Sequence, residues 1–253
     1  MFTVEPAPTQ FDLHFRVAGF PVRVHPFFWL MTLMLGARDD DPMALLIWIG
    51  VVFVSILVHE LGHALLIRYF GQDARIVLYM MGGLAIPESS RWGSSSGRRP
   101  RGELAQILIS AAGPGAGFLL GAVTAIGVLL GGGDVEVVWL RGILPIVVAY
   151  VPEPANVYVN LLVNDLLWAN IFWGLINLLP VNPLDGGTIA RELLTRGDPW
   201  QGTVKSLWLS VIVGAGMAVV GFSALRDPYI AIFFAVLAFS NYTAIQNLQG
   251  RGW

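Results

Sequence analysis

Two histidines and a glutamate stand together in the otherwise apolar segment VHELGHALL, residues 58–66. His59 and His63 are four residues apart, so on a helix they share one face and both imidazoles can reach a single cation. Glu60 is offset from them by about 100°, where it can contact a water molecule that the metal activates. The spacing H-E-x-x-H therefore predicts a zinc site with Glu60 as general base. Such a site suits the hydrolysis of peptide bonds.

A catalytic zinc ion takes three protein ligands, so one more is needed. The chain has no cysteine, and His14 and His25 lie near the N-terminus. The segment NLLPVNPLDGG, residues 177–187, offers the carboxylate of Asp185. Pro180 should end the preceding helix, and the neighbouring prolines and glycines should keep the backbone irregular around Asp185, which a membrane tolerates only beside protein or a polar cavity. The alternative is an ordinary proline–glycine loop at a helix end.

The elements that must position these residues are apolar. Of 253 residues, 55% are hydrophobic and 13% charged, and the mean hydropathy is +0.67, whereas soluble domains carry about 25% charged residues. This composition predicts an all-α polytopic membrane protein, folded as a single membrane-embedded domain over residues 1–253. The N-terminus lacks the basic and apolar regions of a signal peptide. The net charge of −2 gives no indication of a nucleic-acid partner.

Six apolar segments are candidates to cross about 30 Å of hydrocarbon. They are residues 26–37, 43–67, 104–130, 157–179, 204–222 and 229–247. We expect the catalytic core to lie in 43–67, 104–130 and 157–187, with the other segments flanking it. A seventh stretch, 135–151, is interrupted by arginine, glycine and proline, which leaves a span, a re-entrant piece and an interfacial segment as alternatives.

The distribution of basic residues orients these spans. With six spans and both termini on one side, twelve basic residues fall on that side and only Arg38, Arg141 and Arg226 on the other. The basic side is predicted to be the cytoplasmic side of a prokaryotic inner or plasma membrane. Both polar motifs then lie toward the cytoplasm, with His59 about 14 Å below the interface. A crossing at 135–151 would separate the two motifs, so we reject it.

Two segments outside the spans predict strands. PVRVHP, residues 21–26, predicts a short strand at the membrane surface, and ARIVLYMMGGLAIP, residues 74–87, predicts a small hairpin in the cytoplasmic leaflet. The hairpin edge could pair with an extended substrate through main-chain hydrogen bonds, or the hairpin could merely seal the cavity. The basic segment 91–101 is expected to be a flexible linker.

Small and polar residues within the spans have mainly structural interpretations. Close helix packing is predicted by glycines that recur every four residues, namely Gly113, Gly117 and Gly121. Pro114 should kink or start a helix. Asn170 and Asn177 are seven residues apart and are expected to share a face. Interhelical hydrogen bonding accounts for Asn170, whereas Asn177 lies nearer the metal by topology.

HELGH together with NLLPVNPLDGG resembles the site-2 protease family of intramembrane zinc metalloproteases, and the similarity extends to MMGGLA at 80–85 and AAGPGAG at 111–117. The resemblance implies Zn2+ as cofactor, with Glu60 as catalytic base. It implies three zinc ligands, His59, His63 and Asp185. It also implies that Asn177 helps to hold or polarise the substrate.

The same resemblance implies substrates that are transmembrane segments in the lipid bilayer, for example of single-span anti-sigma factors. At 253 residues we expect the minimal form of the family, without a PDZ or nucleotide-sensing domain. The chain departs from the family at Gly117, where asparagine is frequent. The sequence leaves the oligomeric state open.

Two other functions compete with proteolysis. Ionisable residues inside a membrane also mark transporters and channels, but such folds show paired broken helices, and neither polar motif recurs in this chain. An inactive metal-binding scaffold is disfavoured only by the presence of Glu60.

Overall fold

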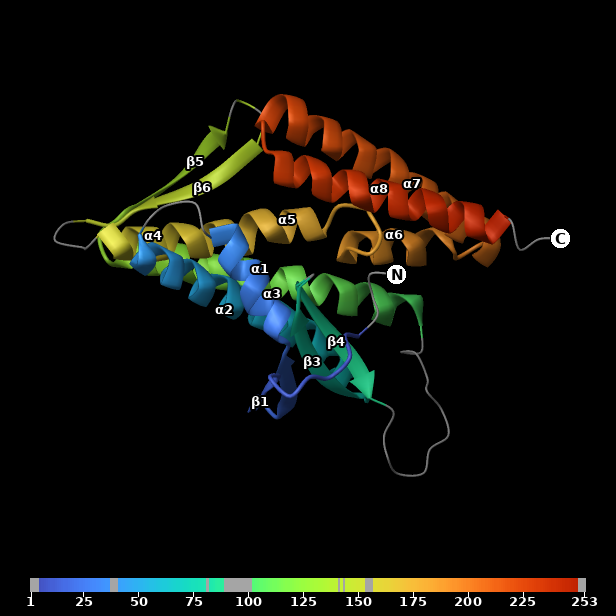
Figure 1. Cartoon of the computed structure of the whole chain (residues 1–253), viewed down its shortest axis with the longest axis horizontal. Coiled ribbons are helices and arrows are strands. Elements are labelled where there is room, and N and C mark those ends of the chain that lie inside the picture. Colours follow the sequence, from blue (N-terminus) through green and yellow to red (C-terminus); the bar gives the residue numbers. More distant parts are fainter. Residues whose placement is uncertain are drawn as a thin grey trace. The chain divides into compact units, whose positions relative to one another are not determined.

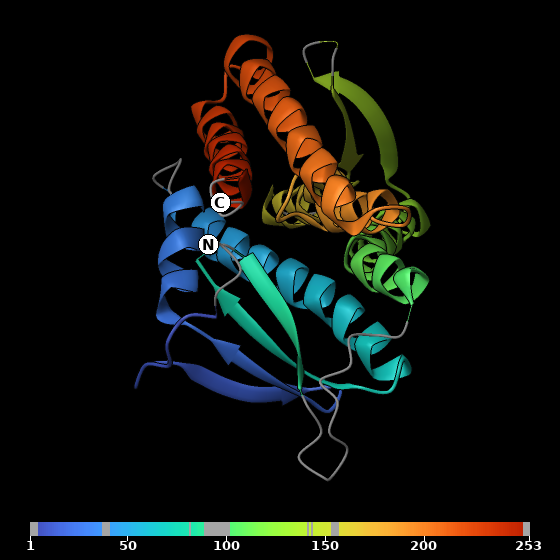
Figure 2. The ribbon, with the colours of Figure 1, turned by 90° about the vertical axis from the view of Figure 1, so that its right-hand side faces the viewer.

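The computed structural model of the chain describes residues 5–36, 41–80, 82–88, 102–140, 142, 144–152 and 157–249. Figures 1 and 2 show its helices and strands. The basic linker expected at 91–101 lies outside the described residues. The chain divides into two compact units, of which the first comprises residues 1–100, 112–138 and 145–174 and the second residues 101–111, 139–144 and 175–253.

The first unit contains a four-stranded sheet in the order β1 (Leu13–Val17), β2 (Phe20–Val24), β3 (Asp73–Tyr79) and β4 (Gly82–Glu88). β1–β2 and β3–β4 are antiparallel pairs, and β2 lies parallel to β3. Most side chains of β2 and β3 are buried, and α2 packs against β3 and β4 (Figure 2). The strand predicted at 21–26 and the hairpin predicted at 74–87 are both confirmed.

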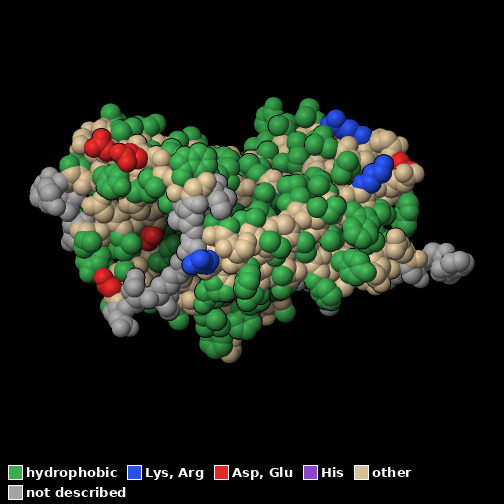
Figure 3. All heavy atoms as spheres, turned by 90° about the horizontal axis from the view of Figure 1, so that it is seen from above, with side chains coloured by type: hydrophobic (Ala, Val, Ile, Leu, Met, Phe, Trp, Pro, Cys, Tyr) green, Lys and Arg blue, Asp and Glu red, His purple; other side chains and the backbone are tan. Residues whose placement is uncertain are grey.

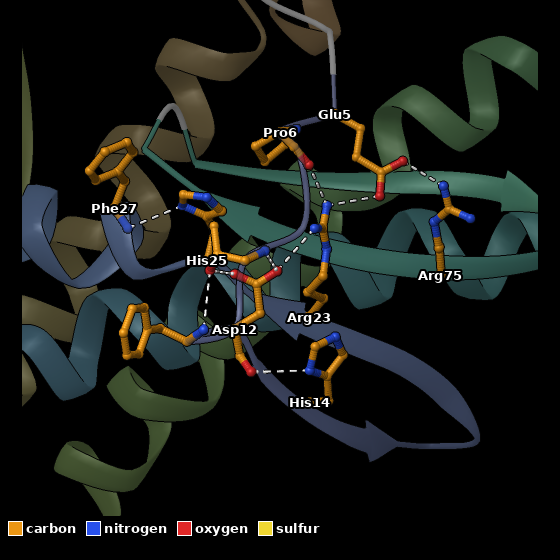
Figure 4. Close-up of polar contacts among 10 residues, drawn as sticks. Glu5, Pro6, Asp12, His14, Arg23, His25, Phe27 and Arg75 are labelled. Atoms are coloured by element: carbon orange, nitrogen blue, oxygen red, sulfur yellow. Dashed lines mark hydrogen bonds and ion pairs between the residues drawn. The ribbon is translucent and has the colours of Figure 1, made fainter.

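Ion pairs fasten the N-terminal segment to this sheet (Figure 4). The Arg23 guanidinium donates to Asp12 at 3.1 Å and to Glu5 at 2.9 Å, and Arg75 donates to the second Glu5 oxygen at 2.5 Å. Burial alone would raise the pKa of Asp12, but hydrogen bonds from Thr9 and the nearby Arg23 charge lower it overall. Asp12 therefore stays ionised and keeps Arg23 paired.

Helices α1 (Pro26–Gly36) and α2 (Pro42–Tyr69) lie between the two halves of the sheet in sequence. α2 begins where its residues favour a helix start, because Asp41 accepts hydrogen bonds from the amides of Met43 (2.9 Å) and Ala44 (3.3 Å) and Pro42 occupies the first turn. It ends before Gly71, whose φ of 85° is a left-handed conformation that favours glycine.

The remaining spanning helices of the first unit are less regular. α3 (Glu103–Leu130), whose first residues belong to the second unit, contains Pro114 in its interior, so Pro114 does not start a helix. α4 (Val157–Leu167) continues through a π-helical turn, η1 (Trp168–Phe172), into α5 (Trp173–Asn177). The wider turn of η1 interrupts the α-helical period between Asn170 and Asn177. Whether these two asparagines share one face stays a prediction.

Residues 135–151, for which the sequence left several structures open, form most of a second hairpin. β5 (Asp134–Leu140) and β6 (Leu144–Tyr150) pair with each other, so residues 135–151 do not form a spanning helix. The Asn164 side chain of α4 accepts from the amide of Ala149 and donates to its carbonyl, both at 2.9 Å. These bonds replace strand pairing for part of the β6 backbone.

The second unit is built on two long helices. α7 (Pro199–Val219) continues into a π-helical turn, η2 (Val220–Leu225), and packs along α8 (Pro228–Gln249), as Figure 1 shows. Asp198 caps α7 by accepting from the amides of Trp200 and Gln201 at 2.9 and 3.0 Å. The short helix α6 (Asp185–Leu194) precedes them. We expected an irregular backbone around Asp185, but Asp185 begins α6.

Five helical segments of the described chain are long and apolar enough to cross a membrane, namely Pro42–Tyr69, Glu103–Leu130, Val157–Asn177, Pro199–Leu225 and Pro228–Gln249. The sixth expected span is α1, which at 11 residues is shorter than the roughly 20 needed to cross hydrocarbon. On the face shown in Figure 3, hydrophobic side chains greatly outnumber charged ones. The prediction of a mostly helical membrane fold with a small sheet is confirmed.

Candidate metal centre

The HELGH motif brings three metal-ligating side chains together on α2. The ligand atoms of His59, Glu60 and His63 all lie within 4.8 Å of one another. The Nε2 atoms of the two histidines are 3.1 Å apart, and their rings meet edge to face. Glu60 is 5% exposed and His63 8%. The helical spacing therefore aims both imidazoles at one point inside the protein.

This geometry fits a zinc ion. Two imidazole nitrogens bound to tetrahedral zinc at about 2.0–2.1 Å lie about 3.3 Å from each other. The observed separation of 3.1 Å between the Nε2 atoms of His59 and His63 is close to that value. Imidazole nitrogens are common zinc ligands, so the two histidines of this motif suit zinc.

Three glycines allow close packing around the HELGH motif. A Cβ on Gly113 of α3 would overlap His63 Nε2 and lie 2.7 Å from His59 Nε2, and a Cβ on Gly83 of β4 would overlap the Glu60 side chain. A Cβ on Gly62 would overlap the carbonyl oxygen of Ala112, so this glycine lets α3 approach α2. The sequence predicted only a helix-packing role for Gly113. The structure places Gly113 against both imidazoles, a contact that depends on how α3 crosses α2.

The β3–β4 hairpin lies beside the glutamate. Gly83 contacts Glu60, and β4 is the last strand of the sheet, so one of its edges pairs with no other strand in the described chain. Tyr79, at the end of β3, was not singled out from the sequence. Burial and then the negative charge of Glu60 raise the pKa of Tyr79, so its phenol remains a neutral hydrogen-bond donor.

Asn170 has the structural role expected of it. It is 2% exposed, and its Nδ2 donates to Ser55 Oγ on α2 and to the Leu166 carbonyl, both at 2.9 Å. A Cβ on Gly117 of α3 would lie 3.3 Å from the Asn170 carbonyl. Asn170 therefore joins three helices within the first unit, and the glycine opposite allows the close approach.

Asp185 and Asn177 belong to the second unit, and their roles at the metal stay predictions. Asn177 is the last residue of α5, and Asp185 is the first of α6. The two glycines after Asp185 are required by close backbone contacts: a Cβ on Gly186 would overlap the Leu178 carbonyl, and one on Gly187 would lie 2.5 Å from the Asn182 nitrogen. The start of α6 is thus folded tightly against the preceding loop.

Side chains from α7 and α8 hold this loop in place. The Asn182 amide donates to Ser210 Oγ at 3.0 Å, and the Asn182 carbonyl accepts from Asn241 Nδ2 at 2.6 Å. Ser210 and Asn241 are 1% and 2% exposed. Sequence analysis missed both residues, because nothing in their local context connects them with a segment dozens of positions earlier.

The comparisons with known proteins agree with the site. The sequence profile described as Peptidase family M50 matches residues 47–219, a range that contains both polar motifs. The chain belongs to this peptidase family.

Relatives in the M50 family include a zinc metalloprotease of Methanocaldococcus jannaschii, 28% identical over 211 residues, which cover 81% of this chain and 51% of that protein. Stage IV sporulation protein FB of Bacillus subtilis is 26% identical over 227 residues, covering 87% of this chain and 66% of that protein. The chain therefore spans about half to two thirds of the length of these curated relatives. A solved site-2 protease from M. jannaschii shares the fold, with a TM-score of 0.54 and 21% identity, over 93% of this chain and 95% of that one.

M50 membership confirms the family that the sequence resembled, and with the His–Glu–His group it identifies zinc as the implied cofactor. Together with the five apolar helices, it makes the chain a multi-pass membrane protein. It also disfavours the transporter alternative, because the matched region contains both motifs and is characteristic of peptidases.

Proposed function

We propose that this protein is an intramembrane zinc metalloprotease that hydrolyses peptide bonds within or near the transmembrane segments of other membrane proteins. The observation that carries this proposal is the His59–Glu60–His63 group, with Glu60 and His63 buried, on an apolar helix long enough to cross a membrane. Three polar side chains inside a spanning helix oppose insertion, so their presence calls for a function that needs them.

His59, His63 and Asp185 are proposed to hold the zinc ion, and Glu60 to act as general base. When bound, zinc would supply Lewis-acid chemistry that polarises the scissile carbonyl and makes water easier to deprotonate. The Glu60 carboxylate would accept the proton from the attacking water and deliver it to the leaving amine. Gly83 leaves the Glu60 side chain room on its β4 side. Asn177 is proposed to hold or polarise the substrate.

The free edge of β4 is a candidate site for substrate binding. A transmembrane helix must unwind before its carbonyl groups are accessible, and main-chain pairing with a strand edge would offset part of that cost. The proximity of Gly83 to Glu60 supports this role, because an added strand at β4 would run close to the general base. Such pairing reads backbone and tolerates many side chains, which suits varied single-span substrates, including anti-sigma factors.

The whole chain is proposed to act as one catalytic domain in a prokaryotic inner or plasma membrane, with the metal site toward the cytoplasm. The basic residues support this orientation: twelve against three fall on the cytoplasmic side if α1 crosses with the five longer helices, and ten against five if it does not.

The test uses purified protein in detergent or lipid with a single-span peptide substrate. Glu60→Gln should lower the cleavage rate by about 10² to 10⁴, while zinc content, measured by mass spectrometry of the metal, stays at the wild-type level. Gly50→Ala is the matched control on the same helix, because its added Cβ would meet no atom within 4 Å.

Asp185→Asn extends the test to the second unit. It should reduce bound zinc as well as cleavage. Cleavage that survives in Glu60→Gln would remove Glu60 from the mechanism, and zinc that persists unchanged in Asp185→Asn would remove that ligand. Wild-type protein that binds zinc and cleaves no membrane peptide would support the inactive scaffold instead.

A further inference from the structure

A separate cavity of about 270 Å³ lies within the first unit, where α1 ends, α2 begins and α4 runs into η1. Its polar and aromatic lining consists of Asp41, Trp48, Asp165 and Trp168, and aliphatic side chains complete the wall. Trp48 is eleven residues from His59 on α2, which is about 16 Å along the helix. The cavity is therefore distinct from the metal centre.

Asp165 is the unusual residue of this cavity. It lies within the spanning segment Val157–Asn177, and the described part of the chain offers it no hydrogen bond or ion pair. A carboxylate in a spanning segment is costly and normally pairs with another group or marks a binding path. Because its side chain lines an open cavity, the missing partner is best supplied by a cationic ligand.

Trp48 supplies the complementary group. Its Nε1 is buried and has no hydrogen-bond partner in the described chain, and a buried N–H without an acceptor is destabilising. The indole is fixed in place, because its Cδ1 lies where a Cβ on Gly36 of α1 would be. The cavity thus presents one unused acceptor, Asp165, and one unused donor, Trp48.

The two indoles decide what kind of cation fits. Trp168 stacks on Phe172 with ring centroids 4.0 Å apart, which fixes its orientation. Indole faces favour organic ammonium groups, whereas small metal cations require several oxygen ligands. Asp41 is already engaged with two amides as the cap of α2, so Asp165 is the main anchor.

We propose that this cavity binds the headgroup of an ethanolamine-type phospholipid. The ammonium group pairs with Asp165 between the indoles, and a phosphate oxygen two carbons away accepts from Trp48 Nε1. A zwitterion of this kind satisfies both unused groups with one molecule. Apolar side chains near the same helix ends are largely exposed, with Met34 65%, Leu46 63% and Val157 70% exposed, and they would contact the acyl chains.

The test measures which lipids stay with the protein. Protein is reconstituted in nanodiscs of equal parts phosphatidylethanolamine and phosphatidylglycerol, re-extracted in detergent, and its retained lipids are counted by mass spectrometry. Wild type should retain phosphatidylethanolamine in preference to phosphatidylglycerol. Asp165→Asn should lower this preference by about tenfold, the effect of losing one charge-assisted hydrogen bond. Glu136→Gln, an exposed carboxylate on β5, should leave it unchanged.

Trp48→Phe provides an independent test that does not alter charge. It keeps an aromatic ring and removes only the donor, so a several-fold loss of preference supports the proposed pairing even if Asp165→Asn folds poorly. Equal retention of both lipids by wild type, or an unchanged preference in both variants, overturns the proposal. Equally tight binding of free phosphoethanolamine would show that the source is not the lipid.

A protein ligand would give a different pattern. If Asp165→Asn keeps its lipid preference and instead slows cleavage of substrates with a lysine or arginine outside the membrane, the cavity binds peptide and the lipid proposal is wrong. The lipid measurement does not depend on proteolysis, so a Glu60→Gln protein should show the same preference as wild type.

Discussion

The two motifs proposed to bind zinc are positioned in opposite ways. His59 and His63 are brought together by the pitch of a single helix, so their 3.1 Å separation is already contained in the spacing of the motif. Asp185 follows a loop whose backbone is held by Ser210 and Asn241 from two later helices. One half of the predicted site is therefore set locally, and the other depends on long-range contacts.

The glycines of the two regions also differ in what they make room for, a side chain of another helix or the backbone of their own loop. Gly113 is outside the HELGH motif and makes room for imidazoles on another helix, whereas Gly186 and Gly187 make room for the backbone of their own loop. Helical spacing can direct two histidines toward one metal ion. The space for the imidazoles also requires that the neighbouring helix has no side chain at that position. The loop instead creates its own shape and needs other helices to keep it.

The largest effect is expected where a neighbouring helix leaves space for the histidines. Gly113→Ala places a Cβ on the His63 imidazole, so the rings cannot stay aimed at one ion. Zinc content should fall by about ten- to a hundredfold at limiting metal, as measured by metal analysis, and cleavage should fall with it. Gly115→Ala, on the same helix with no atom near its added Cβ, is the control. Normal zinc binding in Gly113→Ala would contradict the packing described for α2 and α3.

An intermediate effect is expected at β4. Gly83→Ala pushes against the Glu60 side chain, whose atoms are the nearest to the added Cβ, so zinc content should remain normal. The cleavage rate should fall by about tenfold, because small displacements of a catalytic group slow the reaction. Parallel assays of rate and bound zinc separate this variant from Gly113→Ala. An unchanged rate would show that the Glu60 side chain can move away from β4 without loss of function.

The smallest effect is expected at the long-range support of the loop. Asn241→Leu removes the donor to the Asn182 carbonyl, which should lower the free energy of unfolding by about 1 kcal/mol and weaken zinc binding several-fold. Thermal unfolding in detergent and zinc titration measure the two effects. Thr243→Val on the same helix loses only a local bond to Ser240 and should leave zinc binding unchanged. Equal zinc affinities in the two variants would mean that the loop does not need Asn241.

The parts of the molecule that could be predicted are those governed by local sequence. Long apolar runs located the spans, and the H-E-x-x-H spacing predicted the geometry around Glu60. Residues 135–151 were harder, because a β-branched apolar run is compatible with a strand as well as with a membrane segment. The contacts of β6 with Asn164 in α4 come from a later part of the chain. The turn of η1 was also unforeseen, since helical periodicity carries no sign of a π-helical turn. Asn241 and Ser210 could not be found without the fold.

The parallel pairing of β2 with β3 has a consequence for biogenesis. The chain between these strands contains α1 and α2, so the central pair of the sheet can form only after α2 has been synthesised. β3 and β4 follow directly from α2 in the chain. A newly made polypeptide therefore cannot complete the four-stranded sheet before the ribosome has made the helix that bears the two histidines.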